Sequence, residues 1–100
     1  MNNVTLIGMP GSGKSTIGVI LAKALRYEFL DSDLLIQKQE KRKLSEIIAQ
    51  DGPERFKEIE NQVNADIRVT DTVIAPGGSV IYCEEAMDHL KSIGNIIYLK

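Results

Sequence analysis

Eight residues near the amino end have the types and spacing of a phosphate-binding loop. They read Gly8-Met9-Pro10-Gly11-Ser12-Gly13-Lys14-Ser15 and fit the pattern G-x-x-x-x-G-K-[S/T] completely. In such a loop successive backbone N–H groups bind phosphate oxygens, and glycine permits the close approach that this requires. Lys14 would place a positive charge near the β- and γ-phosphates, and the Ser15 hydroxyl would ligate Mg²⁺. The alternative is an ordinary glycine turn before a helix.

Two aspartates, Asp31 and Asp33, form a second group that could take part in chemistry. They follow a short β-prone run at residues 27–30. Residues i and i+2 of an extended segment share a face, so we expect both carboxylates to point into one cleft, one toward a metal and the other toward an incoming hydroxyl group. The alternative is that Asp31 or Ser32 only caps the helix that follows.

The elements that must position these residues alternate between strand and helix. The β-prone runs lie at residues 3–7, 27–30, 72–75 and 95–100. Helical spacing of apolar residues occurs at 15–25 and 84–92, and a helical pattern with breaks, interpreted as an insert between strands, at 33–64. Because neighbouring parallel strands need crossover connections, this order predicts an α/β fold with a four-stranded parallel sheet between two helical layers.

Ligands of a parallel sheet bind at the carboxyl ends of its strands. Three polar or glycine-rich segments follow such ends: residues 8–15, residues 31–33, and the turn Pro76-Gly77-Gly78-Ser79. We therefore expect these segments to meet at one edge of a single domain that comprises residues 1–100.

Composition restricts the classes of protein that this chain can represent. With 43% hydrophobic and 26% charged residues and a net charge of −2, the 100 residues can form one soluble globular domain. The apolar-leaning stretch 17–25 is shorter than the ~20 residues of a membrane helix, and residues 1–4 show neither the basic region nor the apolar segment of a signal peptide, so we expect a cytoplasmic location. The net negative charge argues against nucleic-acid binding. Cys83 is the single cysteine, which excludes an intrachain disulfide.

Four segments together resemble the shikimate kinases and related small P-loop kinases, which have a nucleoside-monophosphate-kinase-like fold. These segments are residues 8–18, 29–33, 51–60 and 74–80. The phosphate loop alone is common to many families, whereas the combination is more specific. The resemblance implies ATP- and Mg²⁺-dependent phosphoryl transfer to a hydroxyl group of a small anionic metabolite, a step of aromatic amino-acid biosynthesis.

The resemblance also implies a role for each site residue. The nucleotide would be bound by Gly11, Ser12, Gly13, Lys14, Ser15 and Thr16. Ser15 would ligate Mg²⁺ directly and Asp31 through water. Asp33 would bind the acceptor hydroxyl and accept its proton, with Lys14 as the second catalytic residue. The acceptor would be bound by Asp33, Phe56, Lys57, Gly77 and Gly78, although Phe56 is equally compatible with core packing.

Two residues depart from the family pattern on the acceptor side. Lys57 occupies the place of an arginine that holds the shikimate carboxylate, and lysine cannot make the planar two-pronged contact. Glu60, one turn later, is expected to compete for the Lys57 charge. Pro76 replaces the first glycine of the family's triplet, which removes one N–H group and fixes φ. A kinase of a different hydroxy acid is therefore one alternative.

The family's chain continues after the strand that resembles residues 95–100 with a mobile lid and a further strand, so we expect this chain to lack both. Lid closure normally supplies charge and excludes water from the site. A second alternative is therefore a nucleotide-binding P-loop module whose chemistry is absent or regulatory, although the aspartate pair favours a kinase. A GTPase is excluded because neither N-K-x-D nor D-x-x-G occurs in the sequence.

Overall fold

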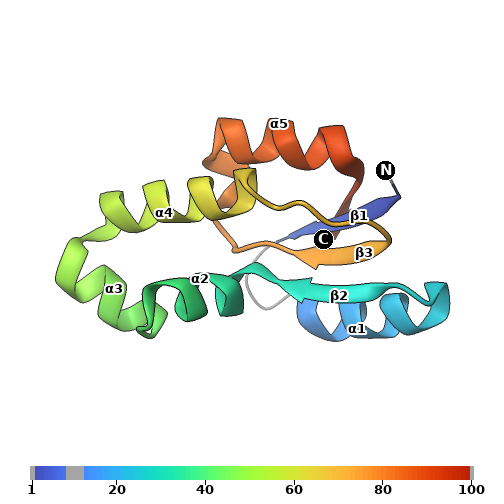
Figure 1. Cartoon of the computed structure of the whole chain (residues 1–100), viewed down its shortest axis with the longest axis horizontal. Helices are drawn as coiled ribbons and strands as arrows, with labels where there is room; N and C mark the ends of the chain where they lie inside the picture. The colour runs from blue at the N-terminus through green and yellow to red at the C-terminus, as the bar shows by residue number, and fades with distance from the viewer. Residues whose placement is uncertain (1, 9–12, 100) are drawn as a thin grey trace.

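The computed structural model describes residues 2–8 and 13–99 and shows a sheet between helices (Figure 1). The strands are β1 (Asn3–Gly8), β2 (Glu28–Asp31), β3 (Thr72–Ala75) and β4 (Gly94–Leu99). The helices are α1 (Lys14–Leu25), α2 (Ser32–Glu40), α3 (Leu44–Asp51), α4 (Pro53–Ala65) and α5 (Glu84–Ile93), and a 3₁₀ turn spans Val80–Tyr82. None of the helices in these residues has the length and apolar character needed to cross a membrane.

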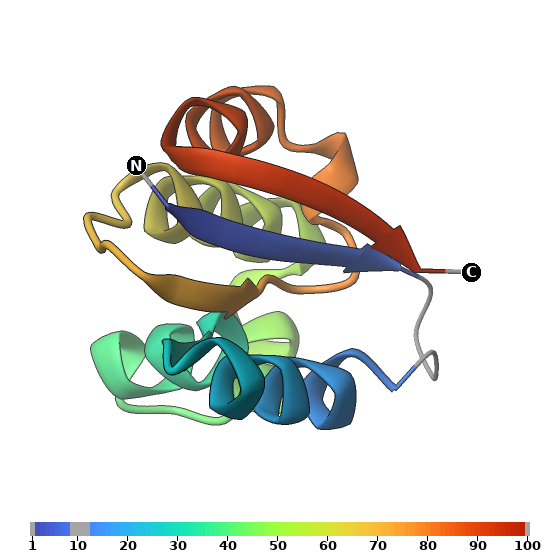
Figure 2. The same cartoon turned by 90° about the vertical axis from the view of Figure 1, so that its right-hand side faces the viewer.

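All strand pairs in the described sheet are parallel, in the order β2-β3-β1-β4. The helix α1 lies on one face of this sheet and α5 on the other (Figure 2). The predicted α/β class, the four parallel strands and the three layers are therefore confirmed. Because all strands run in one direction, β1, β2 and β3 deliver Gly8, Asp31 and Ala75 to the same edge.

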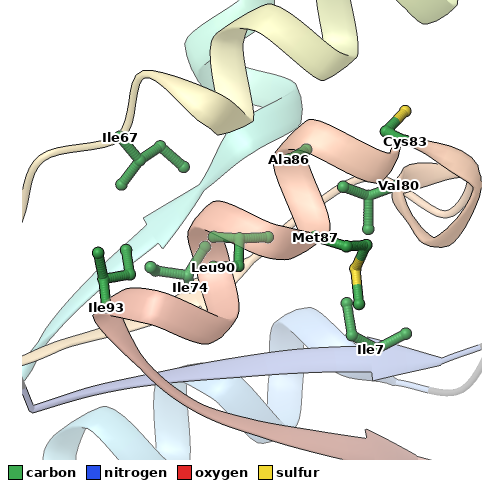
Figure 3. Packing of buried hydrophobic residues seen from close by; sticks show 9 residues of the cluster. All are labelled: Ile7, Ile67, Ile74, Val80, Cys83, Ala86, Met87, Leu90 and Ile93. Atoms are coloured by element: carbon green, nitrogen blue, oxygen red, sulfur yellow. The ribbon is translucent and has the colours of Figure 1, made fainter.

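The two faces of the sheet have separate hydrophobic cores because alternate residues of a strand point to opposite sides. Leu6 of β1 packs toward α1, with Ala22 and Val73. Its neighbour Ile7 belongs to a larger cluster under α5, which also includes Ile74 and Leu90 (Figure 3). Apolar residues from both helical layers thus hold the central strands β1 and β3.

The three helices α2, α3 and α4 form a separate hydrophobic cluster beside the sheet (Figure 1). Ile36, Ile47, Ile59 and Val63 are its buried members, and Phe56 packs against them while remaining half-buried. The helical pattern predicted for residues 33–64 is therefore present as three helices. Its breaks coincide with the ends of α2 and α3, where Lys41 and Gly52 adopt positive φ angles.

The opposite edge of the sheet is fixed by a buried asparagine. The Nδ2 atom of Asn3 donates hydrogen bonds to the carbonyl oxygens of Val69, at 2.9 Å, and Ile93, at 3.0 Å. Its Oδ1 atom accepts from the backbone N–H of Thr72 at 3.0 Å. One side chain thus ties the start of β1 to the start of β3 and the end of α5, which holds the strands in the register that brings their carboxyl ends together.

Candidate active site

The expected nucleotide side of the site lies where β1 ends and α1 begins. Gly13 is the N-cap residue of α1 and has a φ angle of 80°, a left-handed conformation that glycine adopts without steric cost. The first N–H groups of this 12-residue helix have no partners within the helix, so they can bind an anion. Ser15 and Thr16 lie in the first turn of α1, and both are exposed, whereas Lys14 is partly buried. The predicted ligands Gly11 and Ser12 lie outside the described residues.

The Lys14 side chain reaches back to the end of β1. Its Nζ atom donates a hydrogen bond of 3.1 Å to the carbonyl oxygen of Gly8, the last residue of β1. The ammonium group is therefore held at the carboxyl edge of the sheet, between the end of β1 and the start of α1. A phosphate oxygen carries more negative charge than a carbonyl oxygen and would be the stronger partner for this group.

Asp31 ends β2 and is the N-cap residue of α2. Its Oδ1 atom accepts hydrogen bonds from the backbone N–H groups of Asp33, at 2.9 Å, and Leu34, at 3.4 Å. The expectation of an extended segment that places both aspartates on one face was wrong, because α2 begins at Ser32 and Asp33 lies in its first turn. Of the two proposed caps, Asp31 and not Ser32 accepts the helix N–H groups. The cap occupies one carboxylate oxygen of Asp31 and leaves Oδ2 outside it.

Asp33 is half-buried and shares its surroundings with other charges. Burial raises the pKa of its carboxyl group above the ordinary value, the charge of Asp31 raises the pKa further, and the charge of Lys14 opposes both. A carboxylate with a raised pKa holds a proton more readily than an ordinary aspartate. The structure thus brings Asp33 together with Asp31 and Lys14 at the carboxyl edge of the sheet.

The turn after β3 lies directly beside this aspartate. The backbone N–H of Gly77 donates a hydrogen bond of 3.1 Å to Oγ of the fully buried Ser32. A β-carbon at Gly77 would collide with the Glu60 carboxylate and would lie 3.0 Å from Oδ1 of Asp33. A side chain at this position would therefore have to displace the Glu60 carboxylate, and the two carboxylates border the glycine from α2 and α4.

Glu60 is a candidate site residue whose position the sequence reasoning did not anticipate. It is only 1% exposed, and its Oε1 atom accepts a hydrogen bond from Oγ of Ser79. Burial raises the pKa of its carboxyl group most strongly, the Ser79 hydrogen bond lowers it, and the Asp33 charge raises it. The available signal was that Glu60 falls within the apolar stripe of α4, next to Ile59.

The expected competition of Glu60 for Lys57 is not what the structure shows. Glu60 turns inward to Ser79, whereas Lys57 is exposed. Lys57 borders a surface hollow of about 400 Å³ together with Asn61 and Cys83, and Asp33 is not part of its lining. Of the residues predicted to bind the acceptor, Gly77 lies next to Asp33, and Gly78 is exposed in the same turn. Lys57 borders the surface hollow and is not placed beside Asp33.

Comparison with known proteins gives a consistent result. A family model for shikimate kinase matches residues 10–100. A shikimate kinase of Microcystis aeruginosa is 45% identical over 80 residues, which are 79% of this chain and 42% of that protein. The crystal structure of shikimate kinase from Aquifex aeolicus matches with a TM-score of 0.90 and 33% identity, covering 98% of this chain and 59% of that one.

A second solved structure was determined with a ligand. Shikimate kinase from Acinetobacter baumannii in complex with shikimate matches with a TM-score of 0.89 and 32% identity, covering 99% of this chain and 56% of that one. The chain thus spans about half the length of the curated relatives that it matches, with coverage of 42%, 59% and 52% for three of them. The family assignment made from four sequence segments is confirmed.

Proposed function

This chain belongs to the shikimate kinase family, and we propose that the protein transfers a phosphoryl group from ATP to a hydroxyl group of shikimate or a closely related hydroxy acid. The observation that carries this proposal is the grouping of Asp33, Gly77 and Glu60 beside Lys14 at the carboxyl edge of the sheet. A nucleotide-binding module without chemistry has no need for carboxylates with raised pKa values next to the phosphate-binding loop. The kinase is therefore favoured over the binding module.

The described residues on the nucleotide side suit ATP and Mg²⁺. The start of α1 offers free N–H groups for phosphate oxygens, and Lys14 adds a point charge. Ser15 in the first turn of α1 would hold Mg²⁺, and Asp31 would do so through water with the Oδ2 atom that its helix cap leaves over. When bound, Mg²⁺ neutralises charge on the transferred phosphoryl group. The roles of Gly11 and Ser12 in the loop and of Thr16 in the helix stay predictions.

Asp33 would accept the proton of the acceptor hydroxyl. Its raised pKa suits this role because a general base works best when its pKa approaches the working pH. Gly77 would contribute space rather than a hydrogen bond, because its N–H group is already bonded to Ser32. Gly78 is exposed in the same turn, and its backbone would be free to contact the acceptor and the γ-phosphate.

The acceptor is proposed from the relatives of this chain. The Acinetobacter baumannii relative was solved with shikimate, which makes shikimate the first acceptor to test. Phe56 packs within the insert and would at most form the wall of the acceptor pocket.

We propose a cytoplasmic location, because ATP is available there and because the free thiol of Cys83 is typical of a reducing compartment.

The test is phosphoryl transfer by the full-length protein. With ATP, Mg²⁺ and shikimate, we expect ADP to form together with a product that is heavier than shikimate by one phosphoryl group, measured by mass spectrometry. Benzoate, a carboxylic acid without a hydroxyl group, is the matched control and should yield no phosphorylated product. Tight ATP binding without transfer to shikimate or any related hydroxy acid would instead favour the binding module.

A further inference from the structure

A serine in the turn after β3 is bonded to the buried glutamate of the site. Ser79 follows Gly78, is half-buried, and donates its hydroxyl hydrogen to Oε1 of Glu60. The thiol of Cys83 lies 3.9 Å from the same oxygen and is a second, weaker donor. Burial and the neighbouring Glu60 charge raise the pKa of this thiol, so it keeps its proton. The same thiol also lies within reach of the carbonyl oxygens of Ser79, at 3.9 Å, and Lys57, at 4.0 Å, so the Ser79 hydroxyl is the donor that fixes Oε1.

The consequence is a fixed direction for the other carboxylate oxygen. Oε2 of Glu60 is the nearest atom to the position that a β-carbon of Gly77 would occupy, and Oδ1 of Asp33 is the next nearest. Two carboxylates from different helices therefore border the α-carbon of one glycine. Like charges at such a site repel each other, so one of them must be held by hydrogen bonds if both are to remain ionised.

We propose that Ser79 is a positioning residue of the acceptor site: its hydroxyl holds Oε1 of Glu60, so that Oε2 is directed at Gly77, beside Asp33. The proposal rests on the proposed function, because it concerns the side of the site that takes the hydroxy acid. Glu60 is only 1% exposed, so its carboxylate acts on the ligand through Gly77 and the neighbouring Asp33, which accepts a hydrogen bond from the ligand's hydroxyl group. Ser79 acts on this ligand only through Glu60.

The charges that face Glu60 decide the direction of the expected pH effect. Asp33 from α2 and burial disfavour its ionised form, whereas Ser79, Cys83 and Lys14 favour it. A hydroxyl that donates to a carboxylate lowers the pKa of that carboxylate. Removal of the Ser79 hydroxyl should therefore raise the pKa of Glu60, and Glu60 should take up a proton at a higher pH.

The experiment compares Ser79→Ala with Ser79→Thr, which keeps the hydroxyl, and with Ser45→Ala, an exposed serine at the start of α3. In Ser79→Ala we expect the carboxyl ¹³C titration of Glu60, followed by NMR, to move to higher pH. In the full-length protein we expect the KM for shikimate to rise about tenfold, the value for one charge-assisted hydrogen bond, with the KM for ATP unchanged. The acidic limb of the kcat/KM profile should move to higher pH, and Ser79→Thr should restore all three quantities.

The outcomes separate this inference from the proposed function. A parent protein that phosphorylates no hydroxy acid overturns the proposed function and the inference with it. An active parent whose Ser79→Ala variant keeps the parental KM, pH profile and Glu60 titration overturns the inference alone, and so does an equal rise in both KM values. If Ser79→Ala fails to fold, Ser79→Cys keeps a weaker donor of similar size and should show the same shifts at smaller amplitude.

Discussion

On the side expected to bind the nucleotide, the described residues offer mainly the backbone groups at the start of α1, whereas the side expected to bind the acceptor contains the buried side chains of Ser32 and Glu60. On the nucleotide side the start of α1 supplies N–H groups, and Lys14 supplies one charge, which is hydrogen-bonded to the carbonyl oxygen of Gly8. On the acceptor side Ser32 of α2 accepts a hydrogen bond from the N–H group of Gly77, and Ser79 donates one to Glu60 of α4. The Glu60 carboxylate also lies in close contact with Gly77.

This difference has consequences for both stability and chemistry. A charge on the nucleotide side is hydrated without a ligand, so its removal should affect ligand binding and leave folding almost unchanged. A charge on the acceptor side has lost part of its hydration on folding, as the raised pKa values of Asp33 and Glu60 show. Removal of such a charge should alter the chemistry and the free energy of unfolding together.

The largest expected effect follows from Asp33→Asn. If Asp33 is the general base, turnover of the full-length protein should fall by about 10²- to 10⁴-fold, while ATP affinity should change little. The measurements are steady-state kinetics with shikimate and calorimetric titration with ATP. Asp88→Asn, an exposed aspartate of α5, is the matched control and should retain parental turnover. Parental turnover in Asp33→Asn would contradict the role of a base.

The same variant tests burial of the charge through the pH dependence of stability. The pKa of Asp33 is raised above 3.8 in the folded protein, so the folded state binds the proton more tightly than the unfolded state. The parental stability therefore falls as pH rises from the unfolded pKa through the folded pKa. Asparagine cannot ionise, so Asp33→Asn should have a higher free energy of unfolding than the parent at pH 7, and the gain should disappear near pH 3. Denaturant unfolding at both pH values measures this.

A smaller effect, on binding alone, is expected for Lys14→Ala. Loss of a charge-assisted hydrogen bond to phosphate should weaken ATP binding by about 10- to 150-fold in the presence of Mg²⁺, measured by calorimetry. The melting temperature should hardly change, because the described bond of Lys14 is to the carbonyl of Gly8. Lys23→Ala, an exposed lysine in the last turn of the same helix, should bind ATP like the parent. Equal ATP affinity of Lys14→Ala and the parent would remove the basis for the nucleotide side.

The same contrast explains what could be predicted from the sequence. The expected nucleotide side depends on eight contiguous residues, so spacing alone predicts it, and periodicity located β3 at Thr72–Ala75 without error. The aspartate pair was found, but its geometry was not, because helix capping by Asp31 competed with continuation of the strand. The direction of Glu60 depends on Ser79, which is 19 residues away in the sequence. Such a pairing follows from tertiary packing and has no local pattern.

The smallest effect is expected for substitution of Lys57, the predicted acceptor-binding residue that lies away from Asp33. Lys57 stands in the place of the family's arginine, but it is exposed and borders the hollow with Cys83 and Asn61 rather than Asp33. An exposed ammonium on a flexible stem adds little binding free energy, and an arginine fork can hold a carboxylate with two bonds. Lys57→Arg should therefore lower the KM for shikimate by at most about tenfold and leave kcat unchanged, because the contact binds ground state and transition state alike.

Arg55→Lys is the matched control: Arg55 is paired with the exposed Glu58 at 3.0 Å, and its replacement should change neither constant. A low parental KM that Lys57→Arg does not improve would show that the lysine serves as well as the arginine, and shikimate would then be an ordinary acceptor despite both departures on this side of the site.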